Sequence, residues 1–274
     1  MTTIPSSFAA LRWWKRKPIV AAVRLEGVIA SGGFRSGLTL PVVDRALQTA
    51  FRQKRAVEVA LFVNSPGGAP VQAALIHDRI RWLADRHKKR VTIFVEDIAA
   101  SGGYWIALAG DEIVACPSSI VGSIGVITAG FGLDEAIGRL GVKRRLYATG
   151  AHKGMLDPFS PEKEGDIAIL KDLHRDTFEL FVDLVKQRRG DHLATDVELF
   201  DGRVFSGRKA KEAGLVDTVG DPLTLLRNRY GDDVRVRLFT PPRLPWWRRL
   251  RGESETTALA SWLEERLLWS RFGL

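Results

Sequence analysis

The chain has 274 residues, 45% of them apolar and 27% charged, which is ordinary for a folded protein with a sizeable core. Its single cysteine, Cys116, excludes an intramolecular disulfide. The net charge of +9 points to an anionic partner, a nucleic acid or a membrane surface, but no nucleic-acid-binding motif and no zinc-ligand spacing accompany it, so we expect neither nucleic acid nor metal.

Both ends of the chain are rich in tryptophan and in basic residues. Residues 1–18 form a basic, aromatic arm that lacks the apolar core of a secretory signal. Residues 241–274 are likewise rich in tryptophan and arginine, and a helix is predicted over residues 254–272. Tryptophan favours surfaces that are half apolar and half wet, so these segments are expected to contact either a membrane interface or another subunit. No stretch reaches the roughly 18 apolar residues that a membrane-spanning helix needs.

Between these arms, apolar runs alternate with helical patterns along the chain. Strands are predicted over residues 19–30, 56–63, 91–95, 113–115, 142–148 and 233–239. Helices are predicted over residues 39–51, 71–87, 104–109, 133–140 and 162–189, and residues 201–220 are predicted to hold a loop, a short helix and a strand. The alternation is typical of α/β domains, so residues 19–240 are predicted to form one domain. The glycines of residues 122–132 indicate close backbone packing or unusual dihedral angles.

Two glycine-rich turns each follow an apolar strand, and both carry a serine. One is Asn64-Ser65-Pro66-Gly67-Gly68, and the other is Ser101-Gly102-Gly103. Functional sites gather at the carboxyl ends of strands in α/β sheets, so the two turns are expected to converge. Ser101 is then either the N-cap of the following helix or a nucleophile, and the N–H groups of Gly68 and Gly102 could together hold an oxyanion.

A nucleophilic serine needs a base, and the sequence offers two in one loop. His152 and Lys153 lie in the Gly- and Pro-rich loop of residues 149–161. A lysine acts as a base only where burial in an apolar site disfavours its charged form. The other histidines are interpreted as structural or solvated: His77, His87, His174 and His192.

Four segments, in this order, resemble the signal peptide peptidase A family of serine proteases. They are NSPGG, IAASGGYWIALAGDEIVACPSSIVGSIGV, YATGAHKGMLDPFSP and DGRVFSGRKAKEAGLVDTVG, and the resemblance covers about residues 19–225. It implies a Clp protease/crotonase-like fold of stacked β-β-α units with a Ser–Lys dyad and no cofactor. Residue by residue, it implies Ser101 as nucleophile, Lys153 as general base, Ser123 as the group that orients the lysine, and Gly68 and Gly102 as the oxyanion hole.

The resemblance also implies partners and a place in the cell. Short members assemble into homo-oligomeric rings, an octamer being expected, in which neighbours share each active site. Their substrates are signal peptides and other membrane-derived or unfolded peptides. Short members usually begin with a spanning helix, whereas this chain has the basic arm of residues 1–18. A cytoplasmic protein, or one held peripherally on the inner membrane, is therefore expected.

Two other functions fit the same pattern. Paired backbone N–H donors also suit thioester enolates, so a crotonase-like acyl-CoA enzyme is one alternative, although Ser101 and Lys153 would then have no role. A membrane-surface scaffold built on the same ring is the other, and it rests on the terminal tryptophans. A test distinguishes the peptidase from both alternatives: the protein should hydrolyse a peptide, and the variant Ser101→Ala should not.

Overall fold

The structure is a computed structural model that describes residues 17–30, 37–240, 266 and 268–274. The segments 1–16, 31–36 and 241–265 lie outside the described residues, as does residue 267. Most of the predicted N-terminal arm and most of the predicted helix over residues 254–272 therefore lie outside them. Within the described part, no helix is both long and apolar enough to cross a bilayer.

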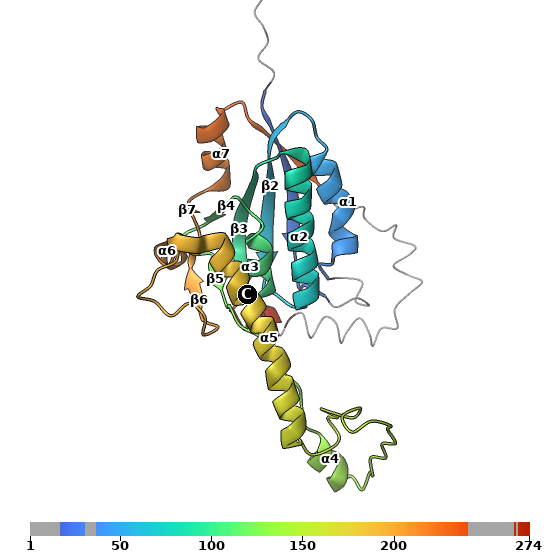
Figure 1. Cartoon of the computed structure of the whole chain (residues 1–274). Coiled ribbons are helices and arrows are strands. Elements are labelled where there is room, and N and C mark those ends of the chain that lie inside the picture. The colour runs from blue at the N-terminus through green and yellow to red at the C-terminus, as the bar shows by residue number, and fades with distance from the viewer. Residues whose placement is uncertain (1–16, 31–36, 241–265, 267) are drawn as a thin grey trace, which may run out of the picture.

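One mixed sheet organises the molecule (Figure 1). Its strands run in the order β6-β5-β3-β2-β1-β8, and β4 and β7 extend from β3. The central pairs are parallel, and among the described strands only β5 and β6 form an antiparallel pair. The strands are β1 (Ile19–Glu26), β2 (Ala56–Ser65), β3 (Val91–Ala100), β4 (Glu112–Ala115), β5 (Ile120–Gly122), β6 (Val204–Ser206), β7 (Thr218–Val219) and β8 (Arg235–Phe239).

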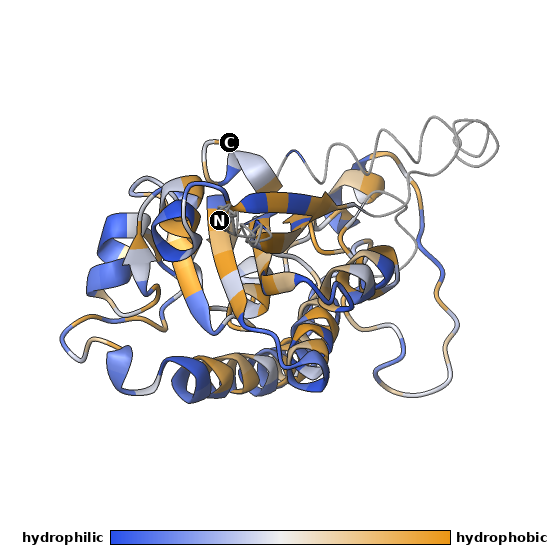
Figure 2. Cartoon of the chain, turned by 90° about the horizontal axis from the view of Figure 1, so that it is seen from above, coloured by the Kyte–Doolittle hydropathy of each residue, from blue (hydrophilic) through white to orange (hydrophobic). Residues whose placement is uncertain are grey.

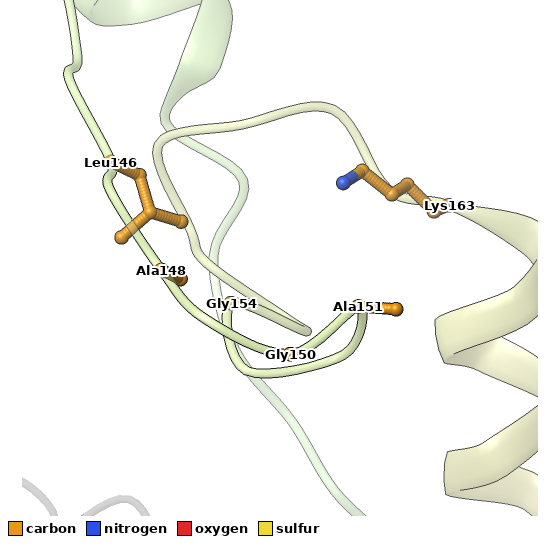
Figure 3. A pocket seen from close by; sticks show the side chains of 6 residues that line it. All are labelled: Leu146, Ala148, Gly150, Ala151, Gly154 and Lys163. Atoms are coloured by element: carbon orange, nitrogen blue, oxygen red, sulfur yellow. The ribbon is translucent and has the colours of Figure 1, made fainter.

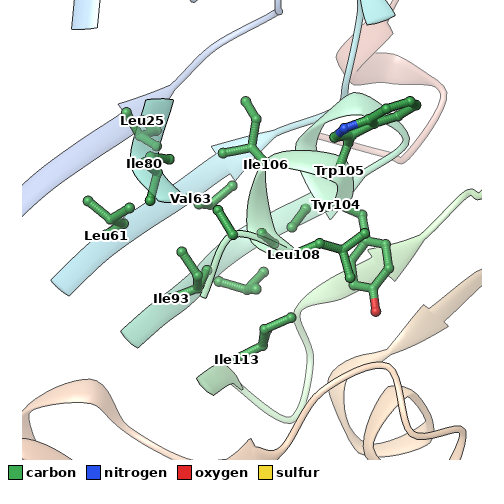
Figure 4. Packing of buried hydrophobic residues seen from close by; sticks show 14 of the residues in the cluster. Leu25, Leu61, Val63, Ile80, Ile93, Tyr104, Trp105, Ile106, Leu108 and Ile113 are labelled. Carbon is green, nitrogen blue, oxygen red and sulfur yellow. The ribbon is translucent and has the colours of Figure 1, made fainter. Parts of the chain in front are cut away.

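Helices cover both faces of this sheet. They are α1 (Leu40–Phe51), α2 (Pro70–His87), α3 (Gly102–Ala107), α4 (Asp134–Arg139), α5 (Glu164–Arg189), α6 (Gly207–Glu212) and α7 (Pro222–Tyr230), with a 3₁₀ turn at Gly190–His192. Alternate strand residues point to opposite faces. Val23, Leu61 and Ile93 therefore pack with α1, α2 and α3, and Figure 4 shows Leu61 and Ile93 in this cluster. On the other face, Ala22 and Phe94 pack with Leu226 of α7.

The inner strands read as continuous apolar runs because helices bury both of their faces. In Figure 2 these strands are largely orange, while the long helix α5 alternates between blue and orange. Helix α7 is held by charge as well as by packing. Arg229 lies 3.0 Å from the fully buried carboxylate of Glu58, and the Tyr230 hydroxyl donates to the same oxygen at 2.9 Å. Burial and the Glu58 charge raise the pKa of Tyr230 to about 12.

Strand β3 is longer than predicted, and the difference matters for the site. Val63 pairs with Val95, but the next pair is Ser65 with Ala99, so three residues of β3 bulge opposite Asn64. The Asn64 side chain fills the bulge, accepting from the Ile98 N–H at 3.2 Å and donating to Asp97 at 2.9 Å. After this bulge β3 continues to Ala100 and pairs with β5, which brings Gly122 beside the serine turn.

An extended arm leaves the body after β5. It comprises residues 126–163 with α4, and the N-terminal half of α5 carries it away from the sheet (Figure 1). The strand predicted over residues 142–148 is wrong: these residues are exposed and form no regular element. A lone strand cannot pair its N–H and C=O groups, and no described strand lies beside this segment to pair with them. The expectation for the glycines of residues 122–132 holds in part. Gly122 has an unusual φ of 109°, whereas a Cβ on Gly130 or Gly132 would meet open space or an ordinary contact, so these two are not closely packed.

Candidate active site

The two glycine turns converge at the carboxyl ends of β2 and β3, as the sequence predicts. A Cβ on Gly67 would lie 2.8 Å from the Ser101 Cβ, and one on Gly103 would lie 2.4 Å from the Ser65 carbonyl oxygen. Real Cβ atoms do not approach other atoms so closely, so these positions accept only glycine without movement of the backbone. The sequence Ser-Gly-Gly after β3 is thus explained by the contact of the two turns.

Ser101 has a strained backbone, and its hydroxyl forms no hydrogen bond within the part of the chain that the structure describes. Its φ of 52° and ψ of −123° are conformations that residues with a side chain rarely adopt, at a cost of about 1–3 kcal/mol. The turn is fixed by its own backbone, since the Ser101 N–H donates to the Gly122 carbonyl at 2.8 Å and its carbonyl accepts from Trp105 at 3.0 Å. The hydroxyl makes no capping hydrogen bond to α3, so Ser101 is not a conventional N-cap.

Two backbone donors lie beside this serine. The place where a Cβ of Gly102 would stand is 3.5 Å from the Gly68 nitrogen. Gly68 is held by hydrogen bonds on either side of it, from Ile29 to the Gly67 carbonyl and from Ala69 to the Ile29 carbonyl, both 2.8 Å long. Among the described residues, neither the Gly68 N–H nor the Gly102 N–H donates to another protein group. The arrangement can therefore donate two hydrogen bonds to a ligand oxygen.

Ser101, Gly68 and Ser123 line one open cavity of about 670 Å³. Ser123 also has a positive φ of 51°, and its N–H donates to the Arg203 carbonyl at 2.7 Å. Apolar side chains contribute to the walls: Ile124, Val126, Ile127, Phe178, Phe200, Leu268 and Phe272. The cavity therefore places a serine hydroxyl beside apolar surface large enough for several residues of a peptide.

Lys153 lies elsewhere in the chain. It is exposed, in a turn closed by its own N–H to the Gly150 carbonyl, within the arm that carries α4. His152 ties this loop to the start of α5, with its Nδ1 3.1 Å from the buried carboxylate of Asp166. The loop encloses a separate hollow of about 430 Å³, toward which the Lys163 side chain extends (Figure 3). Of the described residues that line the Ser101 cavity, none belongs to the Lys153 loop, so one chain does not bring Ser101, Ser123 and Lys153 together.

Helix α5 supplies groups to the cavity that sequence reasoning missed. Lys171, His174 and Arg175 line it, and the His174 Nε2 lies 2.8 Å from the Thr128 hydroxyl. His174 was interpreted as structural or solvated. The available signal was the spacing to Phe178, since residues three and four apart share one helix face. Asp201 also lines the cavity, and hydrogen bonds from the Arg203 guanidinium hold the pKa of its carboxyl below the usual range.

No group of three or more His, Cys, Asp or Glu side chains within the described ranges has the arrangement of a metal site. The chemistry that the described side chains can perform themselves is nucleophilic attack by Ser101 with stabilisation of an oxyanion. Such an attack also needs a general base. His174 and Lys171 are near it within one chain, and Lys153 is not.

Comparison with known protein families gives a match over the second half of the sheet. The model of peptidase family S49 matches residues 84–229. A putative protease of Synechocystis is 32% identical over 267 residues, covering 93% of this chain and 92% of that protein. A putative signal peptide peptidase of Enterococcus faecium is 32% identical over 212 residues, covering 76% and 58% respectively.

A Brucella melitensis protein named as a Na⁺/H⁺ antiporter is 47% identical over 271 residues. The match covers 93% of this chain but only 37% of the Brucella protein, so the chain spans little more than a third of that relative. The antiporter name describes the longer protein and is not carried over.

Solved structures give the fold. Two mutants of the 1510-N membrane-bound stomatin-specific protease, one of them in complex with a substrate peptide, superpose with TM-scores of 0.53. They are 21% and 22% identical and cover 82% and 83% of this chain, and 99% and 94% of their own. At this identity the likeness shows the fold alone, and it confirms the Clp protease/crotonase-like architecture predicted from the sequence.

Proposed function

The chain belongs to peptidase family S49, the signal peptide peptidase A family, and from that premise we propose that it is a serine endopeptidase with a Ser101–Lys153 dyad. Residues 19–240 would form the peptidase domain. The observation that carries the proposal is the strained Ser101, whose hydroxyl is free of capping and lies in a cavity beside two unused N–H donors. An acyl-CoA enzyme of the crotonase type would leave that serine without a role.

The proposed reaction runs in two halves. The neutral Lys153 amine takes the hydroxyl proton as the Ser101 Oγ attacks the peptide carbonyl, and the Gly68 and Gly102 N–H groups hold the oxyanion. As the C–N bond breaks, the ammonium of Lys153 returns its proton to the leaving amine. Water, deprotonated by the same lysine, then releases the acyl group from Ser101. Ser123 would orient the lysine by a hydrogen bond.

The lysine is proposed to come from a neighbouring protomer. Within one chain, Lys153 is exposed on the arm and contributes nothing to the Ser101 cavity. A homo-oligomeric ring, an octamer being expected, would bring the arm of one protomer to the cavity of the next. Burial at that interface would disfavour the ammonium form, as a lysine base requires.

The substrates are proposed to be signal peptides and other membrane-derived or unfolded peptides. The apolar walls of the cavity favour substrates that have small or apolar residues near the cleaved bond. The contact of the terminal arms with a membrane and the cytoplasmic or peripheral location remain predictions from the sequence.

Hydrolysis of a fluorogenic apolar peptide tests the dyad. Ser101→Ala and Lys153→Ala should each lower kcat by on the order of 10⁴-fold or more. His152→Ala and His174→Ala are the matched histidine controls and should keep most of the activity. Loss of activity in His174→Ala with retention in Lys153→Ala would replace the dyad with a Ser–His pair inside one chain.

Mixing the two inactive variants tests whether the site is shared. In randomly mixed rings, about a quarter of the interfaces would combine an intact Ser101 from one protomer with an intact Lys153 from the next. Activity should therefore return to about a quarter of the wild-type value. If both residues act within one chain, mixed rings stay inactive, which would refute the shared site while leaving the peptidase proposal intact.

A further inference from the structure

A strongly basic surface lies at the end of the sheet opposite the candidate active site. Two turns lead into the amino ends of β2 and β3, and their sequences are RQKR (residues 52–55) and RHKKR (residues 86–90, of which the first two end α2). Neither contains an acidic residue. Strand β2 has ten residues, so this end lies about 30 Å from the Ser101 turn.

The two turns form one surface because their strands are neighbours. The Val59 N–H donates to the Arg90 carbonyl at 2.9 Å, and the Lys89 ammonium donates to the Ala56 carbonyl. Strands β2 and β3 run parallel from this point. The seven cations of the two turns are therefore gathered at one edge of the sheet.

Most of these charges have no acidic partner. Arg90 pairs with Glu112 at 2.9 Å. Arg52, Lys54, Arg55 and Lys88 are exposed, and within the described ranges none of them forms an ion pair. Like charges gathered without counter-charges repel one another and destabilise the folded state slightly, so an anionic ligand would relieve that repulsion.

An exposed tryptophan borders the same surface. Trp82, one turn before Arg86 on α2, is 47% exposed, which is high for an aromatic side chain of this size. The guanidinium groups of Arg79 and Arg86 lie 4.7 and 5.0 Å from its ring centroid. A ring that is half wet and flanked by cations suits the headgroup region of a bilayer.

We propose that Arg52, Lys54, Arg55, Arg86 and Lys88, with Trp82, form a docking surface for an anionic phospholipid bilayer. The cations sit on two turns at one end of the molecule, where a planar anionic surface can meet them together. Lys17 lies where the basic N-terminal stretch joins the body. It pairs with Asp233, just before β8, so this stretch joins the body at the same end of the sheet. A chain docked in this way holds its Ser101 cavity away from the lipid. The inference does not depend on the proposed peptidase activity.

Sedimentation of the full chain with vesicles tests the surface. The vesicles are phosphatidylcholine with or without about one third phosphatidylglycerol, so that only the anionic charge differs. The surface variant carries glutamine at three positions: Arg52→Gln, Lys54→Gln and Arg55→Gln. The control carries glutamine at three exposed cations of α6 that have no ion pair within the described residues: Arg208→Gln, Lys209→Gln and Lys211→Gln. Both variants lose three charges and keep both terminal segments.

The surface variant should bind anionic vesicles on the order of a hundredfold more weakly than the wild type, because each of its three lost cations contributes about fivefold near a bilayer. The control should stay within about twofold. Equal losses in both variants would mean that only net charge matters, and no loss in the surface variant would place binding elsewhere; either result overturns the proposal. Circular dichroism melting curves confirm that both variants are folded.

Trp82 separates a bilayer from other polyanions. Trp82→Ala should weaken vesicle binding severalfold, whereas Leu75→Ala, a matched exposed residue two turns earlier on α2, should not. Competition with a single-stranded oligonucleotide supplies the other arm of the test. If the oligonucleotide displaces the chain from vesicles at equal concentrations of phosphate, the surface is a nucleic-acid site and the proposal is wrong.

Discussion

Ser101 holds a conformation that its own side chain disfavours, and its neighbours maintain it. The hydrogen bond to Gly122 fixes its N–H, and the packing of Gly67 against its Cβ leaves no room for relaxation. Gly68 adds to this rigidity, with a φ of 136° and an Ile29 carbonyl oxygen 2.1 Å from where a Cβ would stand. Strain that the surroundings enforce at a cavity is typical of functional residues.

A second residue, His77, should make stability depend on pH. It is buried in α2, its Nδ1 lies 2.8 Å from Asp78, and its Nε2 has no partner among the described residues. Burial is the largest effect and lowers its pKa in the folded state. Asp78 opposes this shift, and the nearby charges of Arg188 and Arg81 add to it, so the net pKa is lowered. The unfolded chain takes up a proton near pH 6.5 that the folded chain resists, so stability is fully present above this pH and falls below it.

Urea unfolding between pH 7 and 5 measures the effect. The free energy of unfolding should fall on acidification with a slope from this residue of at most about 1.4 kcal/mol per pH unit. His77→Gln should flatten the slope in that window, and His87→Gln, at the end of the same helix, is the matched control. An unchanged slope in His77→Gln would show that the buried imidazole is not the group that titrates.

Helix α5 links the body to the arm, and its last turn holds it in place. Arg188 donates to the carbonyls of Leu108 and Gly110 at the end of α3. The buried Arg189 donates to Asp217 through two nitrogens, at 3.0 and 2.9 Å, and to the Gly214 carbonyl. Asp217 in turn accepts from the Ile113 N–H of β4. One forked ion pair and three hydrogen bonds to backbone carbonyls therefore hold the last turn of the long helix where it meets the sheet.

Arg189→Ala should destabilise the protein by about 3 kcal/mol, because it leaves the Asp217 carboxylate partly buried without its partner. Arg189→Lys should restore only part of that loss, since an ammonium cannot reproduce the planar fork. Chemical denaturation with a constant m-value measures both. A loss below about 1 kcal/mol for Arg189→Ala would show that water replaces the guanidinium.

At the scale of elements, most of the fold could be predicted because buried strands and helices have recognisable patterns of apolar residues. Six elements begin and end within a few residues of their predicted bounds, apart from the extension of β3. They are the strands β1, β2 and β3, predicted from apolar runs, and the helices α1, α2 and α5, predicted from helical spacing. The bulge at Asn64 has no local pattern. Residues 142–148 have apolar side chains only at their two ends, and the three cations between them, Lys143, Arg144 and Arg145, suit an exposed segment better than a buried strand. The meeting of Gly68 with Ser101 follows from the parallel strands that precede them, whereas the place of His174 at the cavity depends on the tertiary packing of α5, which the pattern of a single helix does not specify.

The whole molecule leaves apolar surface uncovered on its arm. Phe131 is 84% exposed, Leu140 78% and Tyr147 90%. Single exposed apolar residues are common, but a group of large ones on a projecting segment is typical of an interface. The same segment carries Lys153, so one contact between protomers would bury these side chains and deliver the proposed base.

Introducing charge at this surface should separate the protomers and abolish hydrolysis together. Leu140→Asp or Tyr147→Asp should raise the dissociation constant of the assembly by about thirtyfold or more, the usual effect of losing a central interface residue. Asn228→Asp on α7 adds the same charge at an exposed polar position and should change neither property. Sedimentation velocity and peptide hydrolysis over one concentration series measure both. Dissociated Tyr147→Asp protein with full activity would refute the shared site, because a lysine on the neighbour could no longer reach Ser101.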